Sequence, residues 1–112
     1  MSSVSAVKST PAMMFYAASK AALESMVRTA ALELAQKKKN INCIRAGAFD
    51  SEMHQRVMNG LSDDKVNAFE ERFPLGFGKT SDVLEAIKFY IDNKKSGWIT
   101  GSSVNIDGGY LS

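Results

Sequence analysis

The 112-residue sequence predicts an α/β fold in which helices pack on a parallel sheet. Two observations carry this prediction. Short apolar runs that suit strands alternate with longer segments of helical periodicity, and their order along the chain is helix, strand, helices, strand. Parallel strands need long crossover connections, which helices usually supply. At this length we expect a single domain over residues 1–112.

The first expected element is a long helix over residues 15–36. Its alanine content is high, and alanine is the best helix former. Small residues crowd its first two turns, so another backbone or helix could approach closely there. Apolar side chains also recur at spacings of three and four, the period of one helix face. They are Leu23, Met26, Val27, Ala30 and Leu34.

The next expected element is a strand over residues 41–44, a short apolar run bounded by Asn40 and Gly47. An apolar run of this length between breaking residues is typical of a buried parallel strand. Residues 46–61 show no clear period and contain Gly47, Asn59 and Gly60. This stretch predicts a loop with a single helical turn at residues 53–57.

Two more helices and a last strand are expected in the second half of the chain. Ser62, followed by two acidic residues, predicts a helix that ends by Phe73, before a proline. Thr80 or Ser81 is expected to cap the next helix, which has an apolar stripe of Val83, Ile87, Tyr90 and Ile91. Val104 and Ile106 alternate as in a strand that closes at residues 107–109.

Composition argues against several classes of protein. The net charge of +2 is small and scattered, which disfavours a nucleic-acid partner. The only basic run, residues 37–39, is expected at a helix end, where cations complement the helix dipole; a binding patch is the less favoured alternative. No apolar stretch approaches the roughly 20 residues that span a bilayer, and the N-terminus lacks a secretory signal. We therefore expect a cytoplasmic protein without a membrane partner.

The cysteine and the histidine do not indicate a metal or redox site. Cys43 is the only cysteine, so no intrachain disulfide is possible, and its apolar surroundings favour a small core residue. His54 alternates with Asp50 and Glu52, but it has no second nitrogen or thiol ligand at a metal-binding spacing. We expect no metal site.

The most informative feature is Tyr16 and Lys20, four residues apart, with Ser3 thirteen residues before the tyrosine. Side chains four apart on a helix lie on one face. An ammonium close to a phenol favours the phenolate, which makes a tyrosine a usable general acid or base near neutral pH. The spacing alone is weak evidence, because Tyr90 and Lys94 share it.

The context of this pair resembles the short-chain dehydrogenase/reductase family over essentially the whole chain. Residues 2–5 are similar to the strand that carries the family's catalytic serine, and residues 16–23 to its catalytic helix. Residues 41–47 resemble the strand that leads to the nicotinamide-side loop, although Ala46 stands where the family has proline and Ser51 where it has threonine. Residues 74–83 and 99–109 resemble the C-terminal signature, most closely that of the 3-oxoacyl-carrier-protein reductases and the related sugar and polyol dehydrogenases.

The resemblance implies a role for each matching residue. Tyr16 would exchange the proton with the carbonyl oxygen, Lys20 would bind the ribose hydroxyls of NAD or NADP, and Ser3 would orient the substrate oxygen. Ser51 and the backbone near Phe49 would contact the carboxamide of the cofactor, and Gly47, in the same nicotinamide-side loop, would also bind the cofactor. The simpler alternatives are that Ser3 only begins a loop and that Ser51, in a loop without its proline, contacts no cofactor.

The resemblance also implies a partial fold. Family members are about twice as long, and their first half carries the glycine-rich turn for the cofactor pyrophosphate; no such pattern occurs here. We therefore expect the C-terminal half of a doubly wound, Rossmann-like sheet, truncated at its start. Because such a sheet has unpaired edges, we expect the chain either to form a homo-oligomer through the long helix or a sheet edge, or to be only marginally stable.

The expected function is NAD(P)-dependent interconversion of a ketone and a secondary alcohol on a small-molecule substrate. Two alternatives stay open. The chain is an inactive fragment that cannot hold the cofactor alone, or it is a module for assembly.

Overall fold

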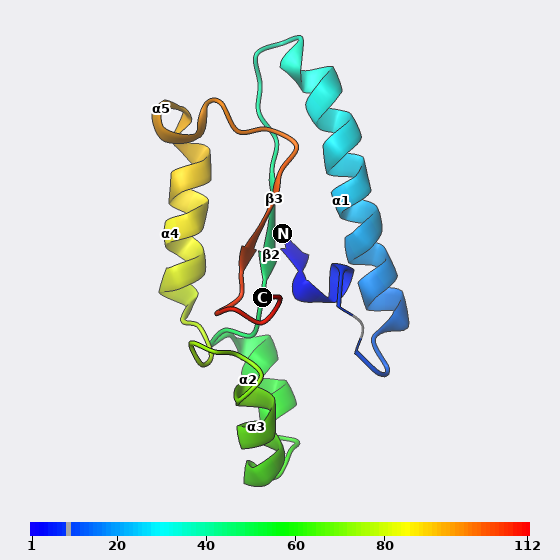
Figure 1. The fold of residues 1–112 in the computed structure, drawn as a ribbon, viewed down its shortest axis with the longest axis vertical. Helices are drawn as coiled ribbons and strands as arrows, with labels where there is room; N and C mark the ends of the chain where they lie inside the picture. Colours follow the sequence, from blue (N-terminus) through cyan, green and yellow to red (C-terminus); the bar gives the residue numbers. More distant parts are fainter. Residues whose placement is uncertain (9) are drawn as a thin grey trace.

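The computed structural model describes residues 1–8 and 10–112. Its centre is a parallel sheet in the order β1-β2-β3, formed by Ser2–Ser3, Cys43–Ala46 and Ser103–Ile106. Figure 1 shows α1 (Met14–Ala35) on one side of these strands and α4 (Thr80–Ile91) on the other. The predicted α/β fold with a parallel sheet, a partial doubly wound arrangement, is therefore confirmed.

The two crossover connections differ in hand. The strands lie side by side in chain order, so two connections of the same hand would put both helices on one side of the sheet. Figure 1 shows the helices on opposite sides, and one connection must therefore depart from the strong preference for right-handed crossovers.

Helix α1 begins and ends within one residue of the predicted bounds. It packs against β1 and against the short 3₁₀ helix η1 (Val4–Ala6), and its buried face includes Val27 and Ala31. The prediction that Met26 faces the core was wrong: its side chain is 67% exposed, because the buried face passes through position 24 instead.

Strand β2 begins two residues later than predicted, at Cys43. The reason is hydrogen bonding to a distant part of the chain. The Ile41 N–H donates to the Thr100 hydroxyl, and the Asn42 amide both donates to the Ile99 carbonyl and accepts from the Ser102 N–H. These bonds connect the chain before β2 to the turn before β3, so the regular ladder starts only at Cys43, which is buried as expected.

Two short helices, α2 (Glu52–Met58) and α3 (Asp63–Glu70), follow β2 and extend away from the sheet in Figure 1. We call them the α2–α3 hairpin. The predicted single turn at residues 53–57 is thus a seven-residue helix, because the Ser51 hydroxyl caps it by accepting from the His54 N–H at 3.2 Å.

The predicted cap of α4 was wrong by one residue. The cap position belongs to Lys79, whose backbone N–H donates to the Asp82 carboxylate at 2.7 Å, while the Thr80 hydroxyl donates to the Asp50 carbonyl. Ile91, predicted for the apolar stripe, is 76% exposed at the end of the helix. The short helix α5 (Asn93–Ser96) then leads toward β3.

Among the described residues, no helix combines the length and hydrophobicity that crossing a bilayer would require. The same residues contain no cluster of three or more side chains suited to hold a metal ion.

Candidate active site

Tyr16 and Lys20 lie together in the first two turns of α1. The Lys20 ammonium is 5.5 Å from the centroid of the Tyr16 ring, within the range of a cation–π interaction. The ammonium also donates to the Met1 carbonyl at 3.1 Å, so it reaches from the helix to the residue before β1. Both side chains are half-buried. The pair predicted from the four-residue spacing is therefore one local group next to the first strand.

Ser3 ends β1 and caps η1. Its backbone is extended, with φ −148° and ψ 154°, and its hydroxyl accepts from the Ser5 N–H at 3.2 Å. A hydroxyl that accepts one bond keeps its own hydrogen to donate. Ser3 thus ends a strand and caps a 3₁₀ helix, which differs from the alternative that it only begins a loop, and this position leaves its O–H as a donor for another oxygen.

The carboxyl edge of the sheet brings Ser3 and Gly47 into one region. Ser3 pairs with Ala46 in the ladder between β1 and β2, and Gly47 is the next residue along the chain. The Gly47 N–H donates to the Ile106 carbonyl at 2.9 Å. In open α/β sheets, ligands bind outside the carboxyl ends of the strands. The predicted loop therefore starts where a ligand is expected.

Gly47 is fixed by close packing against the residue after β3. A Cβ added to it would lie 2.8 Å from the Asp107 Cα, closer than real Cβ atoms approach backbone.

We predict that Gly47→Ala lowers the free energy of unfolding by about 1–3 kcal/mol, because the ends of β2 and β3 would have to separate. Gly60→Ala is the matched control: its added Cβ would meet nothing nearer than the Val57 carbonyl oxygen at 3.6 Å, an ordinary contact. Urea unfolding of both variants measures the difference, and equal midpoints would contradict the packing role.

Phe49 and Ser51 lie farther along the same loop but serve different contacts. Phe49 forms an isolated parallel bridge with Gly78, supported by bonds from the Asp50 N–H to the Gly78 carbonyl and from the Gly78 N–H to the Ala48 carbonyl. Ser51 caps α2, so its oxygen already accepts one bond. The structure thus assigns Ser51 a structural role that the sequence prediction did not include.

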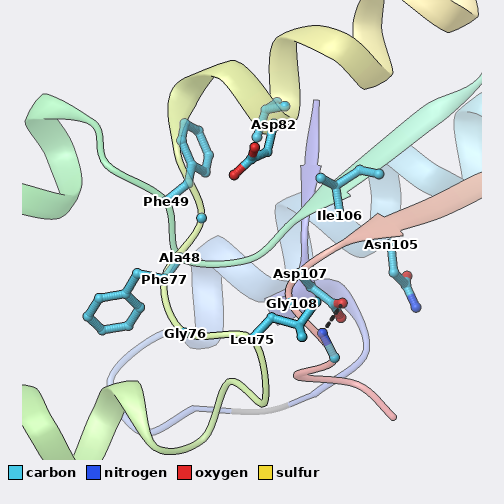
Figure 2. Close-up of a pocket in the computed structure, with 13 residues that line it drawn as sticks. Ala48, Phe49, Leu75, Gly76, Phe77, Asp82, Asn105, Ile106, Asp107 and Gly108 are labelled. Atoms are coloured by element: carbon cyan, nitrogen blue, oxygen red, sulfur yellow. Dashed lines mark hydrogen bonds between the residues drawn. The ribbon is translucent and has the colours of Figure 1, made fainter.

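Figure 2 shows a cleft of about 410 Å³ beside this loop. Its walls come from residues 48–49, 75–78, 82–83 and 105–109. Phe49 is the only predicted site residue among those that line it. The cleft borders the start of α4, whereas Tyr16 and Lys20 belong to α1 on the other side of the sheet. The cleft and the tyrosine–lysine pair are therefore separate features.

A buried ion pair joins α1 to the sheet, one helical turn after Lys20. The Glu24 carboxylate, 3% exposed, accepts two bonds from the Arg45 guanidinium, at 2.7 and 2.6 Å, and a third from the Ser2 hydroxyl at 2.7 Å. Arg45 in turn donates to the Asn105 amide oxygen at 3.3 Å. This network therefore connects α1 to all three strands.

This network was not predicted from the sequence. Glu24 follows Lys20 by four residues and so shares its helix face, and an acidic residue on that mostly apolar face was the signal available. The hydrogen bond from Arg45 is the main cause that lowers the pKa of Glu24 below its ordinary 4.5, and the bond from Ser2 adds to it, although burial acts in the opposite direction. The bond to Glu24 likewise raises the pKa of Arg45.

These shifts predict an acid-sensitive fold. Because the folded state holds the pKa of Glu24 below its unfolded value of 4.5, the carboxylate contributes its full stability above that pH. This contribution is lost as the pH falls through the folded pKa. We expect the urea midpoint of the wild-type chain to fall more steeply below pH 4.5 than that of Glu24→Gln. Parallel curves for the two proteins would contradict the assignment.

Comparison with known proteins identifies the family of the chain. A family model described as enoyl-(acyl carrier protein) reductase matches residues 1–111. The chain is 30% identical over 112 residues to the 3-oxoacyl-(acyl-carrier-protein) reductase FabG of Rickettsia bellii, covering 99% of this chain and 44% of that protein. The chain thus spans less than half the length of the curated relatives it matches.

Two solved structures have the same fold. A 4-hydroxyisoleucine dehydrogenase complexed with NADH gives a TM-score of 0.89 at 26% identity, over 97% of this chain and 44% of that one. An NADPH-bound short chain oxidoreductase from Pseudomonas aeruginosa gives 0.84 at 28% identity, over 99% and 44%. On the matched sequence and the shared fold, the chain belongs to the short-chain dehydrogenase/reductase family.

Proposed function

We propose that this chain carries the catalytic half of an NAD(P)-dependent oxidoreductase that interconverts a ketone and a secondary alcohol. The observation that carries the proposal is the contact between the Lys20 ammonium and the Tyr16 ring, in the helix that packs on the strand of Ser3. The relatives support an oxidoreductase in general, since one is a 3-oxoacyl reductase and two bind NADH or NADPH.

Ser3, Tyr16 and Lys20 have separate roles at the substrate oxygen. The Ser3 hydroxyl donates to the carbonyl oxygen and holds it near Tyr16. Tyr16 gives its phenolic proton to that oxygen as negative charge develops there, and takes the proton back in the reverse direction. The Lys20 ammonium stabilises the phenolate that Tyr16 becomes. A reduced nicotinamide, when bound, supplies the hydride to the carbonyl carbon.

The residues present fit the nicotinamide end of the cofactor. An ammonium has three donors, and the bond to Met1 uses one, so Lys20 can donate to ribose hydroxyls. Gly47 has no side chain to obstruct the carboxyl edge. In the proposal, Phe49 and Ser51 border the carboxamide through their loop. The choice between NAD and NADP is left to experiment, because the relatives include both.

Cofactor binding tests this proposal directly. NADH and NADPH are titrated separately against the purified protein, and the fluorescence of the reduced nicotinamide reports binding. Lys20→Met is expected to weaken binding about tenfold, the loss of a charged hydrogen bond. Lys94→Met is the control, because Lys94 follows Tyr90 at the same spacing in the sequence but lies on α5, away from α1. Equal affinities for the two variants would contradict the role of Lys20. If neither cofactor binds the wild-type chain, the inactive-fragment alternative gains support.

We also propose that a second copy of the chain packs against the outer face of α1. Three large apolar side chains of α1 are exposed: Phe15, at 83%, and Met26, at 67%, which share one face of the helix, and Leu32, at 76%. Large exposed apolar side chains on one helix indicate an interaction surface. Light scattering after size exclusion is expected to show a dimer that Phe15→Glu dissociates, and a monomeric wild-type chain would overturn this proposal.

A further inference from the structure

Tyr110, the buried aromatic residue near the C-terminus, lies at the meeting point of three distant segments. Its side chain is 4% exposed, and its ring stacks on Phe73 with a centroid separation of 4.6 Å and an angle of 22°. Phe73 is equally buried. This stack connects the segment after β3 to the segment after α3.

Two cations hold Tyr110 through separate atoms. The Lys8 ammonium donates to the Tyr110 carbonyl at 2.8 Å and lies 4.1 Å from the ring centroid. The Arg72 guanidinium donates to the Tyr110 hydroxyl at 2.6 Å, with its central carbon 5.1 Å from the same centroid. Lys8 follows η1 on the way to α1, and Arg72 follows α3. One side chain therefore joins the segment that leads to Tyr16 with the α2–α3 hairpin.

The hairpin has a second set of attachments, all aromatic. Phe77 contacts His54 of α2 at 4.6 Å, Phe69 of α3 at 5.6 Å and Phe73 at 5.5 Å between ring centroids. Figure 1 shows the hairpin extending beyond the end of the sheet, so these rings and Tyr110 form its base. Rings in contact can shift relative to one another and stay packed. The charge-assisted bond from Arg72 to the Tyr110 hydroxyl is directional, so it fixes the orientation of the hairpin base relative to Tyr110.

We propose that Tyr110 is a positioning residue: with Lys8 and Arg72 it forms a latch that holds the α2–α3 hairpin in a fixed place relative to residues 4–8, which follow Ser3. The catalytic meaning of the latch rests on the proposed function, because a hairpin at the carboxyl edge would border the substrate. The latch itself is a property of the fold and is measured without turnover.

Amide hydrogen exchange of the wild-type chain and of two variants tests the latch. Tyr110→Phe removes only the hydroxyl and keeps the stacked ring. Arg72→Met removes the guanidinium, whose exposed position lets the variant fold. The reporters are the amides of α3 and those of Val7 and Lys8, which both donate to the Val4 carbonyl. Tyr90→Phe makes the same chemical change as the first variant, on α4, and Arg28→Met matches the second on the exposed side of α1.

In both latch variants the amide hydrogens of α3, Val7 and Lys8 are expected to exchange roughly tenfold faster than in the wild-type chain, because the free energy of local opening is lower once the latch is lost. The exchange rates of α4 should not change. Both controls should match the wild-type chain. Unchanged exchange, equal acceleration in every helix, or an Arg72→Met effect that stops at α3 would each overturn the proposal. Since no cofactor or substrate is present, none of these results depends on the proposed function.

Discussion

Replacing Tyr16 with phenylalanine is expected to lower the rate of ketone reduction roughly 10²- to 10⁴-fold, the usual contribution of a general acid. The variant keeps the aromatic ring, so the contact with the Lys20 ammonium at 5.5 Å from the ring centroid is preserved. Affinity for the reduced cofactor should therefore stay near that of the wild-type protein. Steady-state rates and cofactor titrations on the same preparation separate the two effects.

Tyr90→Phe is the control for that experiment, because Tyr90 lies on α4 with a lysine at the same spacing. It should keep full activity. Wild-type turnover by Tyr16→Phe would remove the catalytic assignment, and a parallel loss of cofactor affinity would show that Tyr16 acts in binding rather than in proton transfer.

Arg45→Met is expected to lower the free energy of unfolding by about 3 kcal/mol. The change leaves the Glu24 carboxylate buried without its main partner, and breaking a buried ion pair in this way costs about 3–5 kcal/mol. The low end applies here because the Arg45 side chain is 20% exposed. Such a loss is large against the total stability of a small domain, roughly 5–15 kcal/mol.

The chain provides a matched control for this prediction. Arg56 pairs with Glu52 across 3.4 Å, but both side chains are at least 80% exposed, so Arg56→Met should cost less than about 1 kcal/mol. The double variant Glu24→Met with Arg45→Met should recover much of the loss, since hydrophobic replacements of a buried pair are often neutral. Equal urea midpoints for Arg45→Met and Arg56→Met would contradict the account.

The fold was largely predictable because its signals are local. The period of α1 and the order of strands and helices follow from neighbouring residues, and they gave the types of α1, β2, α3, α4 and β3 correctly. The errors had two different sources. Asn42 delays β2 because its side chain bonds to the distant turn before β3. The cap of α4 falls on Lys79 because its N–H donates to the nearby Asp82 carboxylate. The opposite hands of the two crossover connections could not be predicted from the sequence either, because the general rule predicts right-handed connections for both.

The candidate site likewise has one part that the sequence predicts and one part that it does not. The grouping of Tyr16 with Lys20 depends on helical spacing, which a sequence displays directly. The pair of Glu24 and Arg45 and the contacts of Tyr110 join residues separated by 21 to 102 positions. No periodicity specifies such contacts, since they depend on how the strands and loops are placed. The role of Ser51 as a helix cap was missed because the helix that it caps was expected only as a turn.

Hydride transfer to a ketone is the most direct test of the central claim. The protein is incubated with a ketone and with reduced NAD or NADP that carries deuterium on the transferable position of the nicotinamide. The account predicts a secondary alcohol with deuterium on the carbinol carbon, formed by the wild-type protein and not by Tyr16→Phe. Cofactor that binds but leaves the ketone unreduced, or an alcohol without deuterium, would contradict it.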